Sequence, residues 1–425
     1  MTASKEKAVT SKVTLERAQE LFRNLFSKRL YKTGNIEEKT LEDADGQILA
    51  KPVYAAVTQP PFARSAMDGY AVRSCDITGA DIKHPVSLEV TAHVYAGQRT
   101  EQKLTEGQAI RIMTGAMIPA GADCVVKQED TDYGSSYDPA GAACDGEKKK
   151  VKIYHAAASG ENYCPAGEDF SKGEKLAEAG EKVDAYMMAA IAAAGVKKLK
   201  VCKKIRAAVI TTGDELQNAG TTLEPGKIYD ANGIWLCARL KEMNCDVVHY
   251  CMTGDDSDRI CGEIERVLQK ADLILTTGGV SVGEKDYLPD VIKKMNGDIL
   301  FHGIRIKPGM PTMLSAVQDT PVLSLSGNPF AVTAVFEMLV GDLLTALPEC
   351  AYAQKQMVLP LKNPFMKTGK MRRIVKGKTD GRDVFLPQIQ RNGQLKNGIG
   401  CNCLVLFPEG EKTYPEGESV TVIQI

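Results

Sequence analysis

The sequence predicts a multidomain protein of the α/β plus β class, on three observations. From about residue 200 to residue 347, apolar runs of strand length alternate with amphipathic helical stretches. That alternation is typical of a doubly wound, mostly parallel sheet covered on both faces. From about residue 53, short alternating runs separated by glycine and proline predict a β-rich region. Short strand-like runs return after residue 347 and predict a small C-terminal β-barrel or sandwich.

The individual elements follow from local patterns. Thr14 precedes an apolar stripe on residues 15–26, which predicts a capped helix. Residues 181–196 predict another helix, which ends at Gly195. In the α/β region, strands are expected at 205–212, 246–253, 272–277 and 321–326, and helices at 231–243, 257–271 (capped by Ser257 or Asp258), 286–295 and 329–347.

Composition argues against several classes of protein. The 425 residues include 53 basic and 54 acidic side chains, for a net charge of -1, so nucleic-acid binding is not expected. The longest apolar run, 185–196, is shorter than the roughly 20 residues that span a bilayer, and the start has no apolar signal core. A cytoplasmic protein is therefore expected. The 12 cysteines and five histidines are scattered without C-x-x-C, so they predict reduced thiols and no structural metal site.

Polar residues gather where the predicted parallel strands end, which is where ligands of such sheets bind. The acidic members at this edge are Asp214, Glu215, Asp230, Asp255 and Asp286. Two cations that suit an oxyanion, Arg305 and Lys307, follow in "IRIKPGMP". Single acids near helix starts, such as Asp230 and Asp255, can be helix caps only. As a group beside an anion site, these carboxylates favour Mg²⁺ shared with a substrate phosphate, with Asp230 and Asp255 as candidate ligands.

Two glycine-containing loops at the same edge predict anion binding through backbone amides. The segment "GGVSVG" supplies Gly278, Gly279, Ser281 and Gly283, and "SGNP" supplies Ser326, Gly327 and Asn328. Neither loop is a Walker A or dinucleotide fingerprint, and glycines after a strand can form a plain tight turn. From the residues alone, we expect an α/β domain that binds an anionic, phosphorylated ligand with a divalent ion. No serine or cysteine has a local base partner, so covalent catalysis is not indicated.

The segment "PPFARSAMDGYAV" (60–72) carries one acid, Asp68, followed by Gly69. Asp-Gly between apolar runs is a strong hairpin signal, because glycine adopts positive φ without penalty. The alternative is a carboxylate presented for chemistry. Local sequence favours the turn and leaves the alternative open.

The motifs "SAMDGYAV", "RIMTGAMIPAGADCVVKQED", "GEDF", "TTGDEL", "IYDANG", "TTGGVSVGEKDY", "IKPGMP" and "SGNP" occur in this order along essentially the whole chain. Together they resemble the molybdopterin molybdenumtransferase family, which includes MoeA-type proteins and the gephyrin E domain. The resemblance implies that molybdate is inserted into the dithiolene of adenylylated molybdopterin, with Mg²⁺-assisted release of AMP. It also implies an elongated homodimer with a shared active cleft. The implied regions are an extended linker and dimer region (1–52 and 156–199), a β-rich domain (53–155), the molybdopterin-binding α/β domain (200–347) and a C-terminal β-barrel (348–425).

Carried over by position, the resemblance implies roles for the residues above. Catalytic roles fall on Asp68, Thr114, Asp214, Glu215, Asp230 and Asp255, with Asp68 facing the α/β domain of the partner subunit. Substrate contacts fall on Gly278, Gly279, Ser281, Gly283, Asp286, Arg305, Lys307, Ser326, Gly327 and Asn328, of which Arg305, Lys307 and Ser326 are the molybdate candidates. Met310 and Ala331 depart from the lysine and serine that the family often has, so the oxyanion site is expected to be rebuilt, and tungstate stays an alternative substrate.

Two rival functions stay open. One is molybdopterin adenylyltransferase activity, which the additional β regions disfavour. The other is a non-catalytic, gephyrin-like scaffold, which the acidic cluster at the strand ends disfavours. A molybdopterin adenylyltransferase and apo-molybdoenzymes are the further partners that the resemblance implies.

Overall fold

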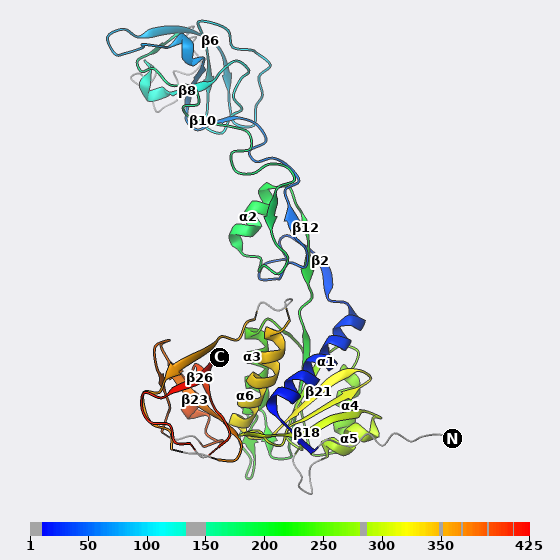
Figure 1. The fold of residues 1–425 in the computed structure, drawn as a ribbon. Coiled ribbons are helices and arrows are strands. Elements are labelled where there is room, and N and C mark those ends of the chain that lie inside the picture. Colours follow the sequence, from blue (N-terminus) through cyan, green and yellow to red (C-terminus); the bar gives the residue numbers. More distant parts are fainter. Residues whose placement is uncertain are drawn as a thin grey trace.

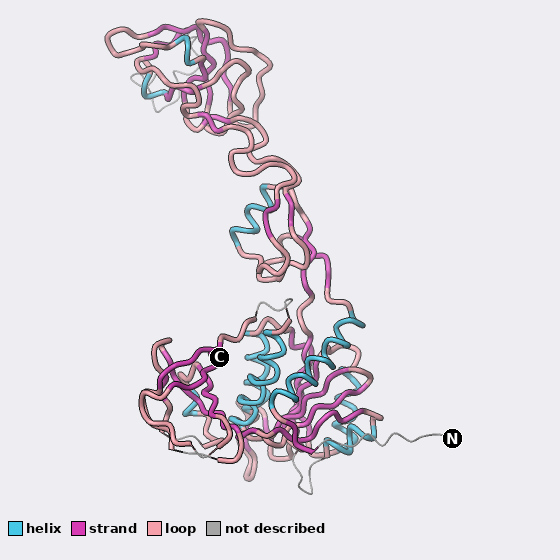
Figure 2. Tube along the Cα trace, in the orientation of Figure 1, coloured by secondary structure: helices cyan, strands magenta, loops and turns pink. Residues whose placement is uncertain are grey.

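The computed structural model describes residues 11–132, 150–280, 287–347, 352–366, 369–388, 391–410 and 412–425. The molecule is elongated (Figure 1). An α/β body and a C-terminal β-rich part lie together at one end, and a β-rich domain lies at the other. A narrow connector joins the two ends, and Figure 2 shows the chain crossing it twice, once outward and once on the return.

The α/β body is built on a sheet of seven strands in the order β1-β18-β20-β21-β17-β13-β16. All neighbouring pairs are parallel except those of β20, which runs antiparallel to both β18 and β21. The strands are β1 (Ser11–Val13), β13 (Arg206–Thr212), β16 (Asp246–Thr253), β17 (Leu273–Thr277), β18 (Asp298–Ile304), β20 (Met313–Val317) and β21 (Thr320–Leu325). The mostly parallel sheet expected from the sequence is confirmed.

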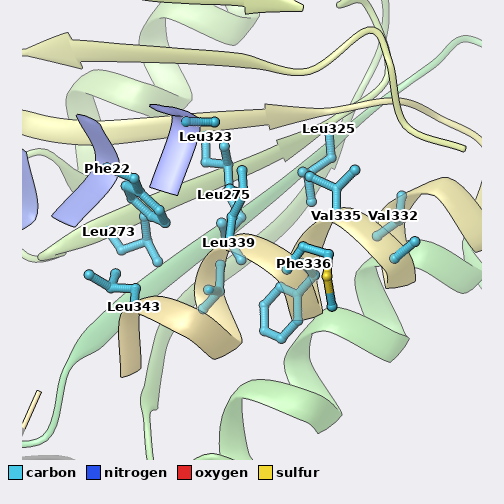
Figure 3. Packing of buried hydrophobic residues seen from close by; sticks show 14 of the residues in the cluster. Phe22, Leu273, Leu275, Leu323, Leu325, Val332, Val335, Phe336, Leu339 and Leu343 are labelled. Carbon is cyan, nitrogen blue, oxygen red and sulfur yellow. The ribbon is translucent and has the colours of Figure 1, made fainter. Parts of the chain in front are cut away.

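Helices cover both faces of this sheet. One face carries α1 (Leu15–Thr33), α3 (Ala231–Glu242) and the chain α6 (Pro329–Phe336), η3 (Glu337–Gly341) and α7 (Asp342–Thr345). The other face carries α4 (Ser257–Val267) and α5 (Leu288–Lys294). Figure 3 shows Phe22 of α1 packed with Leu273, Leu275 and Leu323 of the sheet. Each such fully buried side chain contributes about 1.5–3 kcal/mol.

The C-terminal part is a six-stranded sheet, in the order β19-β23-β25-β26-β22 with β24 beside β23. Its strands are β19 (Ile306–Lys307), β22 (Gln356–Pro360), β23 (Arg372–Thr379), β24 (Val384–Phe385), β25 (Cys403–Phe407) and β26 (Ser419–Gln424), and η4 (Lys396–Gly398) lies between them in sequence. Because β19 directly follows β18, it anchors this sheet to the α/β body. A bridge between Leu361 and Val384 brings the end of β22 to β24. Full closure into a barrel stays a prediction.

The connector pairs β2 (Ile36–Thr40) with β12 (Lys198–Cys202) and carries α2 (Ala185–Ala193). Beyond it, β3 (Val53–Tyr54) pairs with β11 (Lys175–Ala177), and β4 (Arg64–Ser65) pairs with β10 (Tyr163–Cys164). The distal sheet has the order β8-β5-β7-β6-β9. Its strands are β5 (Gly69–Val72), β6 (Val86–Val94), β7 (Gln108–Ile112), β8 (Cys124–Lys127) and β9 (Lys150–Ile153), flanked by η1 (Ser74–Asp76) and η2 (Gln128–Asp130).

The structure differs from the sequence expectations in several places. The cap of α4 is Asp256, whose side chain accepts from the backbone N–H of Arg259 at 2.8 Å, and not Ser257 or Asp258. The helix expected over 329–347 is interrupted by the π-helical segment η3. Residues 11–33 were assigned to the extended region, but they pair and pack with the α/β sheet. The remaining domain boundaries stay predictions.

None of the helices in the described part of the chain combines the length and apolarity needed to cross a membrane.

Candidate functional site

The carboxyl ends of β13, β16, β17 and β21 form one edge of the sheet, which we call the strand-end edge. The register pairs Thr212 with Thr253, Thr211 with Thr277, and Thr277 with Leu325. The loops that follow contact one another. The Asp255 N–H donates to Asp214 Oδ1 at 3.0 Å, and the Asn232 side chain donates to the Gly327 carbonyl at 2.8 Å. Four predicted site residues therefore lie along one edge: Asp214, Asp255, Gly278 and Gly327.

Gly278 and Gly279 follow β17 directly and have φ of +90° and +56°. A Cβ added to Gly278 would lie 2.3 Å from the Thr212 carbonyl oxygen, so only glycine fits there. The glycine is therefore required by the close packing of this loop against the end of β13. The other predicted members of this loop, Ser281, Gly283 and Asp286, lie outside the described residues.

Asp230 is buried, with 5% of its surface exposed. Its Oδ1 accepts from the Gly233 N–H at 2.9 Å, and its Oδ2 accepts from the hydroxyls of Thr211 at 2.7 Å and Tyr250 at 2.8 Å. Burial, together with the bond to Asp230, raises the pKa of Tyr250 well above its ordinary value. Both carboxylate oxygens of Asp230 are thus committed, which favours the helix-cap interpretation. Its assignment to Mg²⁺ stays a prediction.

The side chains of Asp214 and Glu215 are exposed at the strand-end edge, and Asp255 is half-buried. The β13 loop that carries them is fixed by short strands β14 (Leu216–Gln217) and β15 (Ile228–Tyr229) and by Lys227, whose Nζ donates to the Asp214 carbonyl at 2.5 Å. Within the described ranges, these carboxylates do not form a group of three whose ligand atoms all lie within 4.8 Å of one another. These carboxylates offer oxygen ligands, but they are not arranged to surround an ion on their own.

The two predicted cations differ in their surroundings. Arg305 pairs with Glu409 at 3.0 Å, and both side chains are about half exposed. Lys307 lines a cavity of about 330 Å³ between the α/β body and the C-terminal sheet, which we call the cationic cavity. Its other lining residues include Phe330, Arg373 and Arg391, and no described acid lines it. Three cations without a carboxylate make this cavity suitable for an oxyanion.

Sequence reasoning missed Arg373 and Arg391. Arg373 reaches the cavity because β23 pairs with β19 and places it opposite Lys307. The cavity adjoins the strand-end edge through the start of α6, because the Phe330 N–H donates to the Asn392 carbonyl at 3.0 Å. The predicted Ser326 accepts from the Asn328 N–H at 3.1 Å, which shapes the turn that leads into α6. No local sequence signal links the start of α6 with the segment around Asn392, which lies about 60 residues further along the chain.

Asp68 and Thr114 lie together in the distal β-rich domain. The Thr114 N–H and hydroxyl both donate to Asp68 Oδ1 at 2.7 Å, and these bonds lower the pKa of Asp68. Both residues are exposed. Within one chain they lie far from the strand-end edge, at the opposite end of the molecule (Figure 1).

The hairpin interpretation of Asp68-Gly69 is wrong. The flanking strands are not paired with each other, since β4 pairs with β10, and β5 pairs with β7 and β8. Gly69 does not have positive φ. A Cβ at Gly69 would lie 1.9 Å from the Val126 carbonyl oxygen, so close packing against β8 requires the glycine. Asp68 therefore precedes a central strand as an exposed carboxylate.

Comparison with known proteins agrees with this arrangement. Residues 13–195 match the family model "MoeA N-terminal region (domain I and II)", and residues 208–346 match "Probable molybdopterin binding domain". The molybdopterin molybdenumtransferase of Bacillus subtilis (strain 168) is 33% identical over 402 residues, which cover 93% of this chain and 91% of the relative. A Staphylococcus epidermidis protein of the same name is 31% identical over 388 residues, 90% of each chain.

Solved structures show the same relationship. The crystal structure of a molybdopterin biosynthesis MoeA protein from Pyrococcus horikoshii is similar with a TM-score of 0.77 at 31% identity, and the match covers 97% of this chain and 99% of that chain. A second MoeA structure from this organism matches with a TM-score of 0.69 at 26% identity over 98% of this chain and 100% of that chain.

Proposed function

This chain belongs to the molybdopterin molybdenumtransferase family, and we propose that it inserts molybdate into the dithiolene of adenylylated molybdopterin and releases AMP. The observation that carries the proposal is the cationic cavity beside the strand-end edge. An oxyanion held by Lys307, Arg373 and Arg391 would lie next to the edge that carries the turn of Gly278 and Gly279. This combination serves a reaction that brings a metal oxyanion to a phosphorylated organic ligand.

The exposed carboxylates suit a role with Mg²⁺. Mg²⁺ takes oxygen ligands, keeps several waters and typically uses one or two protein carboxylates with substrate phosphates. The exposed Asp214 and Glu215, with the half-buried Asp255 beside them, fit that description, whereas the buried Asp230 already accepts three hydrogen bonds. When bound, Mg²⁺ would neutralise charge on the phosphates during AMP release. The chain's own part is to hold these carboxylates still through the contact between Asp214 and the Asp255 N–H.

We further propose a homodimer in which Asp68 of one subunit faces the strand-end edge of the other. Support comes from the elongated shape, which keeps Asp68 away from that edge in its own chain. Met67 and Asp68 are both exposed, as a surface that approaches another subunit requires. A cytoplasmic location is part of this proposal, and the ten free thiols of the described residues suit a reducing compartment.

The rival functions have less support. A molybdopterin adenylyltransferase would not need the distal β-rich domain or the C-terminal sheet, whereas the relatives match this chain over 90% or more of its length. A scaffold without activity would not need a cavity that is lined by three cations and, among the described residues, by no acid. Exchange of substrate or product with an adenylyltransferase and with apo-molybdoenzymes fits the proposed reaction.

The decisive experiment gives the purified protein adenylylated molybdopterin, molybdate and Mg²⁺. We expect release of AMP and formation of a product that activates an apo-molybdoenzyme. A parallel assay with tungstate determines which oxyanion is preferred. Failure to release AMP with both oxyanions would contradict the proposal. Adenylylation of molybdopterin from ATP would instead establish the rival adenylyltransferase activity.

A further inference from the structure

A cluster of three chemically different side chains lies between the edge strand β16 and the helix α4. His249 and Cys251 are two residues apart on β16 and therefore point to the same face of the sheet. Glu263 approaches them from α4, which packs over that face. One ligand atom from each residue lies within 4.8 Å of the other two, and all three residues are half-buried. Among the described residues, no other group of histidine, cysteine and acid meets this criterion.

We propose that His249, Cys251 and Glu263 bind a zinc ion that fastens β16 to α4. Imidazole nitrogen, thiolate sulfur and carboxylate oxygen are the three ligand types of protein zinc sites. Bond lengths of about 2.0–2.3 Å in a tetrahedron separate the ligand atoms by about 3.4–3.6 Å. His249 Nε2 and Glu263 Oε2 are 2.9 Å apart, so a metal between them requires only a small outward rotation of these side chains.

The charges around the cluster suit a divalent ion. A zinc ion is neutralised by the Glu263 carboxylate and the Cys251 thiolate, whose proton passes to solvent on binding. Arg266 Nη1 lies 2.9 Å from Glu263 Oε1 and also donates to Oε2 at 3.2 Å, the oxygen that faces His249. Arg266 is 60% exposed, so its side chain is free to move and hold Oε1 alone when the ion takes Oε2. With three protein ligands, water would occupy the fourth position.

This site is separate from the strand-end edge but connected to it through the chain. Asp255 and the cap Asp256 lie between the end of β16 and the start of α4. An ion that ties β16 to α4 therefore restricts the segment that carries Asp255. The expected role is structural, because the three ligands come from two elements that the ion would hold together.

The test titrates reduced, metal-free full-length protein with Co²⁺ and then with Zn²⁺. We expect one equivalent of Co²⁺ to give thiolate-to-cobalt charge transfer and tetrahedral absorption bands, which Zn²⁺ abolishes. Cys251→Ser should lose the charge-transfer band, and His249→Gln and Glu263→Gln should bind at least tenfold more weakly. Zinc should raise the melting temperature of the wild type and not that of Cys251→Ser.

The matched control is Cys237→Ser, which changes another half-buried cysteine, on α3 at the opposite face of the sheet. It should bind one equivalent of metal as the wild type does. The proposal is overturned if no stoichiometric cobalt–thiolate band forms, or if the three ligand variants bind like the wild type. Should Cys251→Ser fail to fold, Glu263→Gln, which keeps the shape of the side chain, decides the question by the same titration.

Discussion

At the scale of single residues, the carboxylate of Asp68 is held by Thr114 rather than by a turn. Two donors of one residue converge on one oxygen, Oδ1, at 2.7 Å. They stabilise the ionised form and so lower the pKa of Asp68. Asp68 is therefore held as a negative charge on an exposed surface.

Thr114→Val tests this arrangement, because it removes the hydroxyl donor and keeps the N–H. We expect the pKa of Asp68 to rise toward its ordinary value, as measured by carboxyl-carbon NMR titration. A lowered native pKa gives stability that is present above the unfolded-state pKa and is lost as the pH falls through the native pKa. The Thr114→Val variant should therefore lose less stability than the wild type as the pH falls. Thr78→Val, whose hydroxyl bonds backbone carbonyls only, should leave the Asp68 titration unchanged.

Gly69 gives a second prediction at this scale. Its missing Cβ would collide with backbone on β8, which cannot move without disturbing the sheet. Gly69→Ala should cost about 1–3 kcal/mol of stability through overpacking. Gly262 in α4 is the matched control, since a Cβ there meets nothing within 4 Å. Gly262→Ala should stabilise the protein by about 0.5–1 kcal/mol. Thermal unfolding that shifts in the same direction for both variants would contradict this account.

At the scale of elements, the cationic cavity depends on the pairing of β19 with β23. That pairing places Arg373 opposite Lys307, across about 65 residues of sequence. A charge-assisted hydrogen bond is worth about 1.5–3 kcal/mol, so Arg373→Ala should raise the KM for molybdate about 10- to 100-fold. Arg382→Ala, in the same C-terminal part but outside the cavity lining, should leave the KM unchanged. Equal KM values for the two variants would show that the oxyanion does not bind in the cationic cavity.

The ion pair between Arg239 of α3 and Glu337 of η3 joins two helices on one face of the sheet. Arg239 Nε lies 2.7 Å from Glu337 Oε1, and the Glu337 side chain is fully buried. Glu337→Ala removes the buried partner of Arg239 and leaves this largely buried cation with the exposed Glu242, so it should cost about 3–5 kcal/mol. Glu242 contacts the same arginine at 2.8 Å but is 64% exposed, so Glu242→Ala should cost less than about 1 kcal/mol. Urea unfolding of the two variants measures the difference.

The same elements show how far sequence could predict this molecule. Strands β13, β17 and β21 were predictable from their short apolar runs, and β16 from the stretch "DVVHYCMT", which is rich in β-branched and aromatic residues. Parallel order then places the ends of these strands at one edge. The cap of α4 was not predictable, because Asp256, Ser257 and Asp258 are three consecutive residues that can each cap a helix, and the structure uses Asp256. Arg373 and the group of His249, Cys251 and Glu263 come together only through non-local pairing, which leaves no local pattern.

At the scale of the whole molecule, the elongated fold separates two sets of predicted site residues. Asp68 and Thr114 lie in the distal β-rich domain, and the strand-end edge lies in the α/β body beyond the connector (Figure 1). The connector, which consists of two paired strands and one short helix, separates the distal domain from the edge of its own chain. If both sets act on one substrate, a second subunit has to supply one of them.

Mixed dimers test this requirement directly. Asp68→Ala and Asp214→Ala homodimers should each be inactive, because every cleft lacks one carboxylate. In a mixed dimer with clefts shared between subunits, one cleft carries both substitutions and the other carries neither. Free exchange of subunits between equal amounts of the two variants should therefore restore about a quarter of the wild-type activity.

The control mixes Asp68→Ala with an inactive variant of the same domain, Thr114→Asp. This mixture should restore no activity, because each cleft then keeps a defect. An inactive first mixture, with mixed dimers verified by two affinity tags, would show that Asp68 and Asp214 do not meet across the subunit boundary.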